Sequence, residues 1–281
     1  MNATLWKVSR RLGKPILEVA LRRAECLSGF RTAAGDYLPN RLRMFVGSYE
    51  AEELNLMRRS IWPGQTIIDA GANIGYTARF FAEAVGEGGI VYAFEPNPLI
   101  FPLLEKNVAG SEQVKTFNLG LSSRTDEIEL FLAGNNHSVA SFSEKYPAMH
   151  LAYRKDETVR SVRVKVVSGD EFVRAEGINH IDAIKLDVEG WELHVLAGFE
   201  KTIAKSPGIS LFCEFSPPAQ KCAGHTPRDL LDWLWDHKFT IRYPKDGRLS
   251  PVSPDSIDRF IAEVIARDYV TIFATRVKGE K

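Results

Sequence analysis

The stretch that decides the fold is Ile67-Ile68-Asp69-Ala70-Gly71-Ala72-Asn73-Ile74-Gly75-Tyr76. An apolar run that ends in a glycine-bearing turn and continues as a helical pattern is typical of the first strand, turn and helix of a nucleotide-binding α/β fold. Gly71 allows a positive φ and a close approach of a ligand to the backbone, and Gly75 permits close packing of helix on strand. The stretch therefore predicts a ligand site where the first strand ends.

The second predicted strand, Ile90–Phe94, ends in Glu95. An acid at this place is well suited to accept hydrogen bonds from both hydroxyls of a ribose. Asn73 stands where a dinucleotide-binding turn has its middle glycine, and Asp69 adds negative charge where a phosphate would sit. A cationic ligand group fits these residues better, so the pattern favours S-adenosylmethionine over NAD.

Short apolar runs alternate with helical patterns after Pro63-Gly64, which predicts an α/β fold with a mostly parallel sheet covered on both faces. The further predicted strands are 114–119, 181–186, 209–215, 240–243 and 269–275. The predicted helices are 74–85, 98–108, 168–176, 190–204, 226–237 and 254–266.

The stretch 120–167 interrupts this alternation and is predicted to bind the acceptor. It contains predicted strands over 127–132 and 162–167 and a polar, irregular segment over 133–160. Loops of that length inside a compact domain are usually functional or disordered. His137 lies in this segment and is a candidate base, while aromatic residues such as Phe142 and Tyr146 are candidates to line a sugar site.

The chain has 281 residues, of which 44% are hydrophobic and 26% charged, and its net charge is zero. A neutral chain argues against a nucleic-acid partner. The charge is distributed unevenly along the chain, because residues 1–43 hold nine basic and three acidic residues. We expect residues 1–62 to form a helical attachment or lid, with helices over 3–28 and 49–61 and a loop over 31–43. Residues 63–281 are then the main domain.

Three scattered cysteines, the lack of a signal-like segment and the lack of a membrane-spanning run predict a cytoplasmic protein. The basic segment 1–30 has two interpretations. It docks on the acidic main domain as a lid or as a contact in a homodimer, or it binds the anionic surface of a membrane.

Six segments in order resemble the FkbM-type methyltransferases, a family within the class I S-adenosylmethionine-dependent methyltransferases. They are G-S-Y-E (47–50), I-I-D-A-G-A-N-I-G-Y (67–76), A-F-E-P-N-P (93–98), N-L-G-L-S-S (118–123), I-K-L-D-V-E-G-W-E (184–192) and C-E-F-S-P (213–217). The resemblance implies a Rossmann-like fold with a seven-stranded sheet whose last strand is antiparallel. It also implies S-adenosylmethionine as cofactor and methyl transfer, usually to a hydroxyl oxygen.

The resemblance also implies which residues hold the cofactor. The turn around the methionine part would comprise Asp69, Gly71, Ala72, Asn73, Gly75 and Tyr76. Glu95 would hold the ribose, and Pro96 and Asn97 would border the adenine. Backbone groups of Asn118, Gly120 and Leu121 would touch the adenine, although no acid that could bind its amino group lies in 118–123.

Three carboxylates, Asp187, Glu189 and Glu214, follow the ends of two further strands and are the catalytic candidates together with His137. Asp187 would bind the cofactor's ammonium or face the transferred methyl group, while a carboxylate or His137 would act as base toward an acceptor hydroxyl. Like charges at adjacent strand ends require a cation or a proton among them. We expect no metal, because there is no dense D-x-D cluster, with Mg²⁺ on these three carboxylates as the alternative.

These features predict an O-methyltransferase that acts on a hydroxyl of a sugar, a glycan or a secondary metabolite. A nucleotide-binding oxidoreductase is one alternative, which Asn73 in place of glycine disfavours. A non-catalytic module that retains the fold is another.

Overall fold

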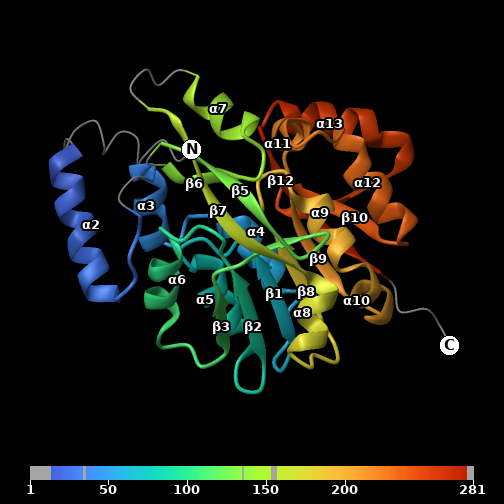
Figure 1. Cartoon of the computed structure of the whole chain (residues 1–281), viewed down its shortest axis with the longest axis horizontal. Helices are drawn as coiled ribbons and strands as arrows, with labels where there is room; N and C mark the ends of the chain where they lie inside the picture. The colour runs from blue at the N-terminus through green and yellow to red at the C-terminus, as the bar shows by residue number, and fades with distance from the viewer. Residues whose placement is uncertain (1–13, 34–35, 135, 153–156, 277–281) are drawn as a thin grey trace.

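The computed structural model describes residues 14–33, 36–134, 136–152 and 157–276. Within these residues, the central sheet has eight strands in the order β11-β10-β12-β9-β8-β1-β2-β3 (Figure 1). The strands are β1 (Thr66–Ala70), β2 (Ile90–Phe94), β3 (Val114–Phe117), β8 (Ala183–Leu186), β9 (Ser210–Phe215), β10 (Thr240–Lys245), β11 (Arg248–Val252) and β12 (Val270–Thr275).

Five neighbouring strands, β3, β2, β1, β8 and β9, pair in parallel, and β12 runs antiparallel to β9 and β10. The predicted Rossmann-like α/β class is confirmed. The predicted number of seven strands is wrong by one in the described part of the chain, because β11 extends the edge as a hairpin with β10. Asp246 and Gly247 join the two strands with φ values of 51° and 73°. A two-residue hairpin turn with positive φ at both positions favours an Asp-Gly pair.

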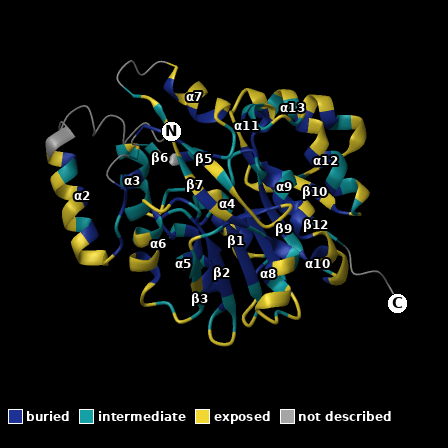
Figure 2. Cartoon of the chain, in the orientation of Figure 1, coloured by how far each residue is buried: buried dark blue, intermediate teal, exposed yellow. Residues whose placement is uncertain are grey.

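Helices cover both faces of the sheet, as the two hydrophobic clusters on either side of it show. Successive strand residues point to opposite faces. Ile68 therefore packs in a cluster with residues of α8, α9, α10, α12 and α13, while Ile67 packs with α4 and α5. These helices are α4 (Ala51–Arg58), α5 (Tyr76–Val85), α8 (Gly169–Ala175), α9 (Glu192–Gly198), α10 (Glu200–Lys205), α12 (Pro227–Asp236) and α13 (Ile257–Ile265). Figure 2 shows the strands buried and the outer faces of the helices exposed.

The stretch 120–167 forms a second sheet of four strands among the described residues, in the order β4-β7-β5-β6. They are β4 (Gly120–Ser122), β5 (Asp126–Ala133), β6 (Asn136–Ser141) and β7 (Val159–Ser168), and α7 (Lys145–Leu151) follows β6. The two predicted strands are confirmed. The predicted irregularity of 133–160 is wrong, because it contains β6 and α7. The polar β6 is a strand through its pairing with β5, where Ala140 lies opposite Leu132, and not through its own propensity.

Among the described residues, three helices precede the main sheet: α2 (Lys14–Ser28), α3 (Leu38–Phe45) and α4. The predicted helix over 3–28 is confirmed from residue 14 onward, and its first residues lie outside the described ones. The predicted loop over 31–43 is wrong in its second half, since α3 begins at Leu38 with Pro39 in its first turn. Proline is tolerated there because the first N–H groups of a helix have no partner within it.

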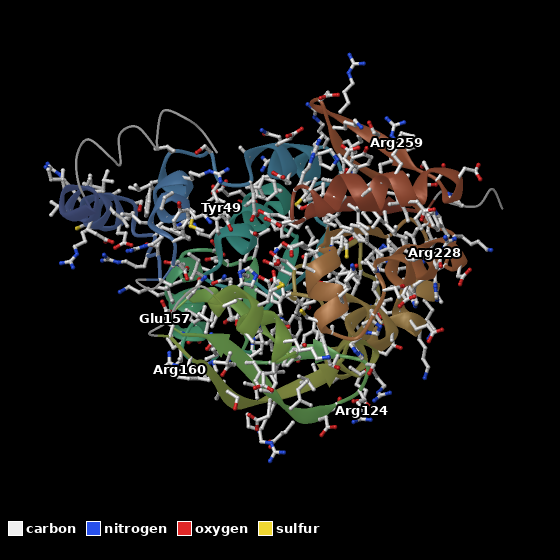
Figure 3. All side chains as sticks on the ribbon, turned by 90° about the horizontal axis from the view of Figure 1, so that it is seen from above. Tyr49, Arg124, Glu157, Arg160, Arg228 and Arg259 are labelled. Carbon is white, nitrogen blue, oxygen red and sulfur yellow. The ribbon has the colours of Figure 1, made fainter. Side chains whose placement is uncertain are left out.

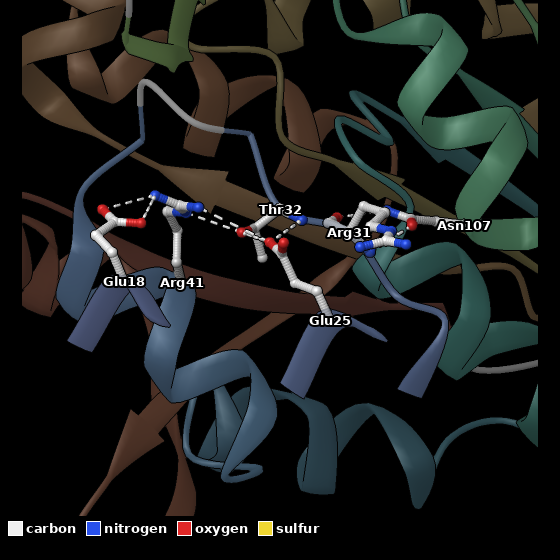
Figure 4. Close-up of polar contacts among 6 residues, drawn as sticks. All are labelled: Glu18, Glu25, Arg31, Thr32, Arg41 and Asn107. Carbon is white, nitrogen blue, oxygen red and sulfur yellow. Dashed lines mark hydrogen bonds and ion pairs between the residues drawn. The ribbon is translucent and has the colours of Figure 1, made fainter. Parts of the chain in front are cut away.

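Arg41 of α3 connects the N-terminal helices through polar contacts (Figure 4). Its Nε donates to Thr32 Oγ1 at 2.8 Å, and its Nη1 lies 3.3 Å from Glu18 Oε1. The carboxylate of Glu25 accepts a hydrogen bond from the Thr32 N–H at 3.0 Å. Arg41 is only 5% exposed, and both acids of α2 are directed toward it.

Asn107, in α6 (Phe101–Val108), ties this attachment to the turn after β1. Its Oδ1 accepts from the Arg31 N–H at 2.7 Å, and its Nδ2 donates to the Ile74 carbonyl at 2.7 Å. Phe30 and Ala33 also pack with Ile74 in one hydrophobic cluster. The N-terminal segment therefore rests directly on the turn that the sequence identifies as the ligand site.

A glycine is required at position 71 because two strand ends approach each other closely there. Its φ is 80°, and a Cβ at this position would lie 1.8 Å from the carbonyl oxygen of Asp187. The sequence predicted that this glycine makes room for a ligand. The structure adds a second requirement for glycine here, because the backbone at the end of β8 occupies the place of a Cβ, while Gly71 itself lies on the cavity wall.

We predict that Gly71→Ala is more destabilising than Gly64→Ala. Gly64 has φ of 84° and nothing within 4 Å of a built Cβ, so both variants share the cost of the left-handed backbone but only Gly71→Ala adds a collision. The added cost should be about 2 kcal/mol or more. Urea unfolding of both variants measures it, and equal losses would contradict the steric role.

Candidate functional site

A cavity of about 500 Å³ opens at the carboxyl ends of the central strands. This is the edge at which open α/β sheets bind ligands. The structure brings seven of the predicted site residues together on its wall. They are Gly71, Asn73, Glu95, Pro96, Asp187, Glu189 and Glu214.

Asp69 does not line this cavity, although the sequence placed it at the cofactor. It is fully buried, neither of its carboxylate oxygens has a hydrogen-bond partner, and Lys185 Nζ lies 3.6 Å from its Oδ1. Because Asp69 is the fourth residue of a buried five-residue strand, it lies behind the strand end and not beyond it. Gly71, Asn73 and Glu95 occupy the wall in its place.

Other predicted cofactor residues support the wall from behind. Ala72 is buried against α5 and α6, and Tyr76 packs on the rings of Phe30 and Tyr49. Gly75 faces α6 and not the strand, because its Cβ would lie 2.8 Å from Leu104 Cδ1. The sequence therefore identified the turn, but only two of its predicted residues reach the cavity.

Asn97 and Asn118 hold the segment after β2 in place. The Asn97 N–H donates to Glu95 Oε1 at 2.8 Å, and Asn118 Nδ2 donates to the Glu95 carbonyl at 2.8 Å. Gly120 and Leu121 lie in β4 of the second sheet and not at the end of β3, and Leu121 is buried in the core. These four residues do not line the cavity.

Glu95 is an acid of the wall that two backbone N–H groups hold in place. Its two carboxylate oxygens accept the N–H groups of Asn73 at 2.9 Å and Asn97 at 2.8 Å, and the residue is 7% exposed. Burial raises the pKa of Glu95 to about 7, against the lowering effect of these hydrogen bonds. The carboxylate thus links the turn after β1 to the turn after β2.

Lys185 is one of the residues that the sequence reasoning missed. It lies in β8 with 7% of its side chain exposed, and its Nζ is 3.0 Å from Asp187 Oδ2. Burial lowers the pKa of Lys185, but the charges of Asp187 and Asp69 outweigh that effect and the pKa is raised. A lysine inside an otherwise apolar strand, Ala-Ile-Lys-Leu, was the available signal, because lysine is almost never buried without a partner.

Glu189 and Glu214 face the cavity from the ends of β8 and β9. The pKa of each is raised, first by burial and then by the negative charge of Asp187. Tyr146 of α7 hydrogen-bonds the Glu189 carboxylate. Glu189 has a φ of 53°, and Ser141 Oγ donates to its carbonyl at 2.8 Å. The second sheet therefore fixes Glu189 through both its main chain and its side chain.

The attachment contributes Tyr37, Asn40, Tyr49 and Glu50 to the cavity wall, which the sequence did not predict. Glu50 precedes α4 with a φ of 48°, and burial raises its pKa to about 7. Tyr49 lies toward the centre of the molecule in Figure 3, whereas Arg124, Arg228 and Arg259 lie at its periphery. Strained backbone at a non-glycine residue is concentrated at functional sites.

The wall is rich in carboxyl groups. Its acids are Glu50, Glu95, Asp187, Glu189, Glu214 and Asp268, and no lysine or arginine is among the described residues that line it. No group of three or more His, Cys, Asp or Glu side chains in the described ranges is arranged to hold a metal ion. The side chain of His137 lies outside the described part of the structure, so its predicted role stays a prediction.

We predict that the unliganded protein loses stability as the pH rises from about 5 to 8. Glu50, Glu95 and Glu192 have pKa values of about 7 when folded, above their ordinary value of 4.5, so the folded state holds protons that the unfolded state has released. Their favourable contribution is complete below pH 4.5 and is lost through pH 7.

Replacing Glu50 by Gln should flatten the fall in Tm between pH 5 and 8. The loss of unfolding free energy over this range should be smaller than in the wild type by an amount on the order of 2 kcal/mol. Glu52→Gln, at an exposed position of the same helix, is the matched control and should leave the profile unchanged. Parallel profiles for wild type and Glu50→Gln would refute the assignment.

Comparison with known proteins shows the family of the chain. The Methyltransferase FkbM domain matches residues 69–241, which is more than half of the chain. The 2-O-methyltransferase NoeI of Sinorhizobium fredii is 25% identical over 65% of this chain and 76% of its own length. The hexuronic acid methyltransferase AglP of Haloferax volcanii is 29% identical over 71% of this chain and 73% of its own length.

A tRNA (adenine(58)-N(1))-methyltransferase, TrmI of Thermus thermophilus, is 27% identical over 59% of this chain and 67% of its own length. The prediction that nucleic acid is not a partner is therefore not confirmed and stays a prediction. The oxidoreductase alternative is set aside, since the relatives and the domain are methyltransferases. The chain belongs to the FkbM methyltransferase family and is an S-adenosylmethionine-dependent methyltransferase.

Proposed function

We propose that the protein transfers a methyl group to a hydroxyl oxygen of a sugar, a glycan or a secondary metabolite. The observation that carries the proposal is one cavity that joins the Gly71 turn and Glu95 to two further carboxylates, Glu189 and Glu214. The Gly71 turn and Glu95 suit the cofactor. The carboxylates of Glu189 and Glu214 suit an acceptor that must lose a proton. The names of NoeI and AglP, a 2-O-methyltransferase and a hexuronic acid methyltransferase, support this class.

The wall fits the cofactor by charge and by donor pattern. S-Adenosylmethionine supplies an electrophilic methyl group on a sulfonium and carries an ammonium group. Asp187 would bind the ammonium, and Glu95 would accept the ribose hydroxyls. Gly71 and Asn73 would border the methionine part. An acidic wall without lysine or arginine among its described residues suits these positive charges.

Glu189 or Glu214 would take the proton of the acceptor hydroxyl as its oxygen becomes the nucleophile. A base works best when its pKa lies near the working pH, and burial has raised the pKa of both groups in that direction. Tyr146 orients Glu189 by its hydrogen bond. The rest of the rate enhancement comes from the alignment of the acceptor in a confined site.

The acceptor would lie against the second sheet and α7, which supports the predicted acceptor-binding role of 120–167. Leu130, Val139 and Phe142 of that stretch line the cavity beside Tyr146. The many carboxyl groups of the wall disfavour an anionic acceptor such as a phosphate diester of RNA, because those that are ionised repel it in a desolvated site. A neutral polyhydroxy acceptor therefore fits better than a uronic acid or a nucleic acid.

The proposal is tested by labelled methyl transfer to neutral glycans, uronic acid glycans and tRNA, followed by mapping of the methylated atom. We expect an O-methylated neutral product, and about a hundredfold or greater loss of turnover in Glu189→Gln or Glu214→Gln with cofactor affinity retained. Glu105→Gln, exposed on α6, is the control. Methylation of tRNA nitrogen instead would overturn the proposal.

We propose that residues 1–62 form an attachment whose helix α2 contacts an anionic membrane surface. Glu18 and Glu25 are directed to Arg41, so no exposed residue of the described side chains of α2 is acidic. The outer face exposes Ile16, Val19 and Leu27, at 56, 67 and 81%, beside Arg22 and Arg23. Apolar and cationic groups on one helix face suit the headgroup region of an anionic bilayer.

In the described part of the chain, no helix has the length and apolar content that a transmembrane helix requires. The proposed contact is therefore one along the plane of the interface.

We predict that the full chain cosediments with vesicles containing phosphatidylglycerol and not with neutral phosphatidylcholine vesicles. Ile16→Ser with Val19→Ser and Leu27→Ser should weaken that binding about tenfold or more, because each removes exposed apolar surface from the membrane contact. Val46→Ser, exposed elsewhere in the attachment, is the control. A homodimer that the triple variant dissociates, with no vesicle binding by the wild type, would show that α2 binds a second copy instead.

A further inference from the structure

The side chain of Lys185 touches three groups at the ends of the two central strands. Its Nζ lies 3.0 Å from Asp187 Oδ2, 3.5 Å from the Gly71 carbonyl oxygen and 3.6 Å from Asp69 Oδ1. β1 and β8 are neighbours in the sheet, with Ala70 opposite Leu186. One ammonium therefore links the glycine turn after β1 to the carboxylate after β8.

Two roles are compatible with a buried cation here. It could serve only to neutralise Asp69, which is fully buried and has no hydrogen-bond partner. It could instead hold Asp187 and the turn in the arrangement that binds the cofactor. The first role concerns folding, and the second concerns the site.

The distances favour the second role. The contact with Asp187, at 3.0 Å, has hydrogen-bond length, whereas the contact with Asp69, at 3.6 Å, does not. The same ammonium reaches the Gly71 carbonyl, at the residue where the turn meets the cavity. Asp187 is 29% exposed in its side chain and lines the cavity, while Lys185 itself is not on that wall.

We infer that Lys185 is a positioning residue for the cofactor's amino acid part: its ammonium holds Oδ2 of Asp187 and the Gly71 carbonyl, and leaves Oδ1 of Asp187 to the cofactor's ammonium. This rests on the proposed place of Asp187. A charge-assisted bond of Asp187 to a second ammonium is favourable only if its carboxylate is fixed beforehand, because otherwise the ordering of the side chain opposes binding.

The test separates the two roles by removing Asp69 together with Lys185. In Asp69→Asn/Lys185→Met no buried carboxylate of β1 remains to be neutralised, and Asp187 has lost its partner. Calorimetry should show S-adenosylhomocysteine binding weakened about tenfold to a hundredfold. Binding of 5′-methylthioadenosine, which has no amino acid part, should stay within about twofold of wild type on the same grounds.

Three further variants make each outcome decisive. Asp69→Asn alone is the matched control and should bind both ligands like the wild type. Lys185→Arg keeps a cation opposite Asp69 but moves the donor, so it should lose affinity for S-adenosylhomocysteine selectively even if the double variant does not fold. Asp187→Asn should give the same selective loss.

Wild-type affinity for S-adenosylhomocysteine in both the double variant and Lys185→Arg would overturn the positioning role. If Asp187→Asn also binds normally, the proposed place of Asp187 fails as well. If Asp187→Asn alone is impaired, only the role of Lys185 fails. Equal losses for both ligands in the folded variants would indicate a structural role and would likewise overturn the inference.

Discussion

A buried ion pair at the ends of β1 and β8 is the constraint on which the rest of the site depends. Lys185 lies between Asp187 and Asp69, with Gly71 pressed against the backbone of Asp187. Charges in a protein interior are tolerated only when their partners are well placed, and removal of one partner is costly. The contacts of Lys185 with Asp187 and with the Gly71 carbonyl therefore hold the two strand ends together at the edge where the cavity opens.

Negative charge is the second organising feature, and it follows from the first. One buried ammonium faces more carboxylates than it can neutralise, so burial and mutual repulsion raise the pKa values of Glu50, Glu189 and Glu214. Such a cluster lowers the stability of the folded protein at neutral pH. The cluster is favourable only when a cationic ligand enters, which agrees with the cofactor of the family.

The sequence predicted the central strands well because they are apolar on both faces and bounded by turn residues. It located Glu95, Asp187, Glu189 and Glu214 correctly at strand ends, since a strand's end marks the cavity edge. It placed Asp69 at the cavity, which Asp69 does not line, because whether a residue near a strand end faces a ligand or the interior depends on the exact end of the strand and on its neighbours. It missed β6 and the role of Arg41, because both depend on partners that are remote in sequence.

The attachment completes the site in a way that the sheet alone does not. Tyr37, Asn40, Tyr49 and Glu50 close one side of the cavity, and Asn107 joins Arg31 to the Ile74 carbonyl within the glycine turn. The hydrogen bonds of Arg41 hold α2 and α3 together, so contacts run without a break from α2 to that turn. An N-terminal segment so connected is part of the cavity wall, which an independent helical extension would not be.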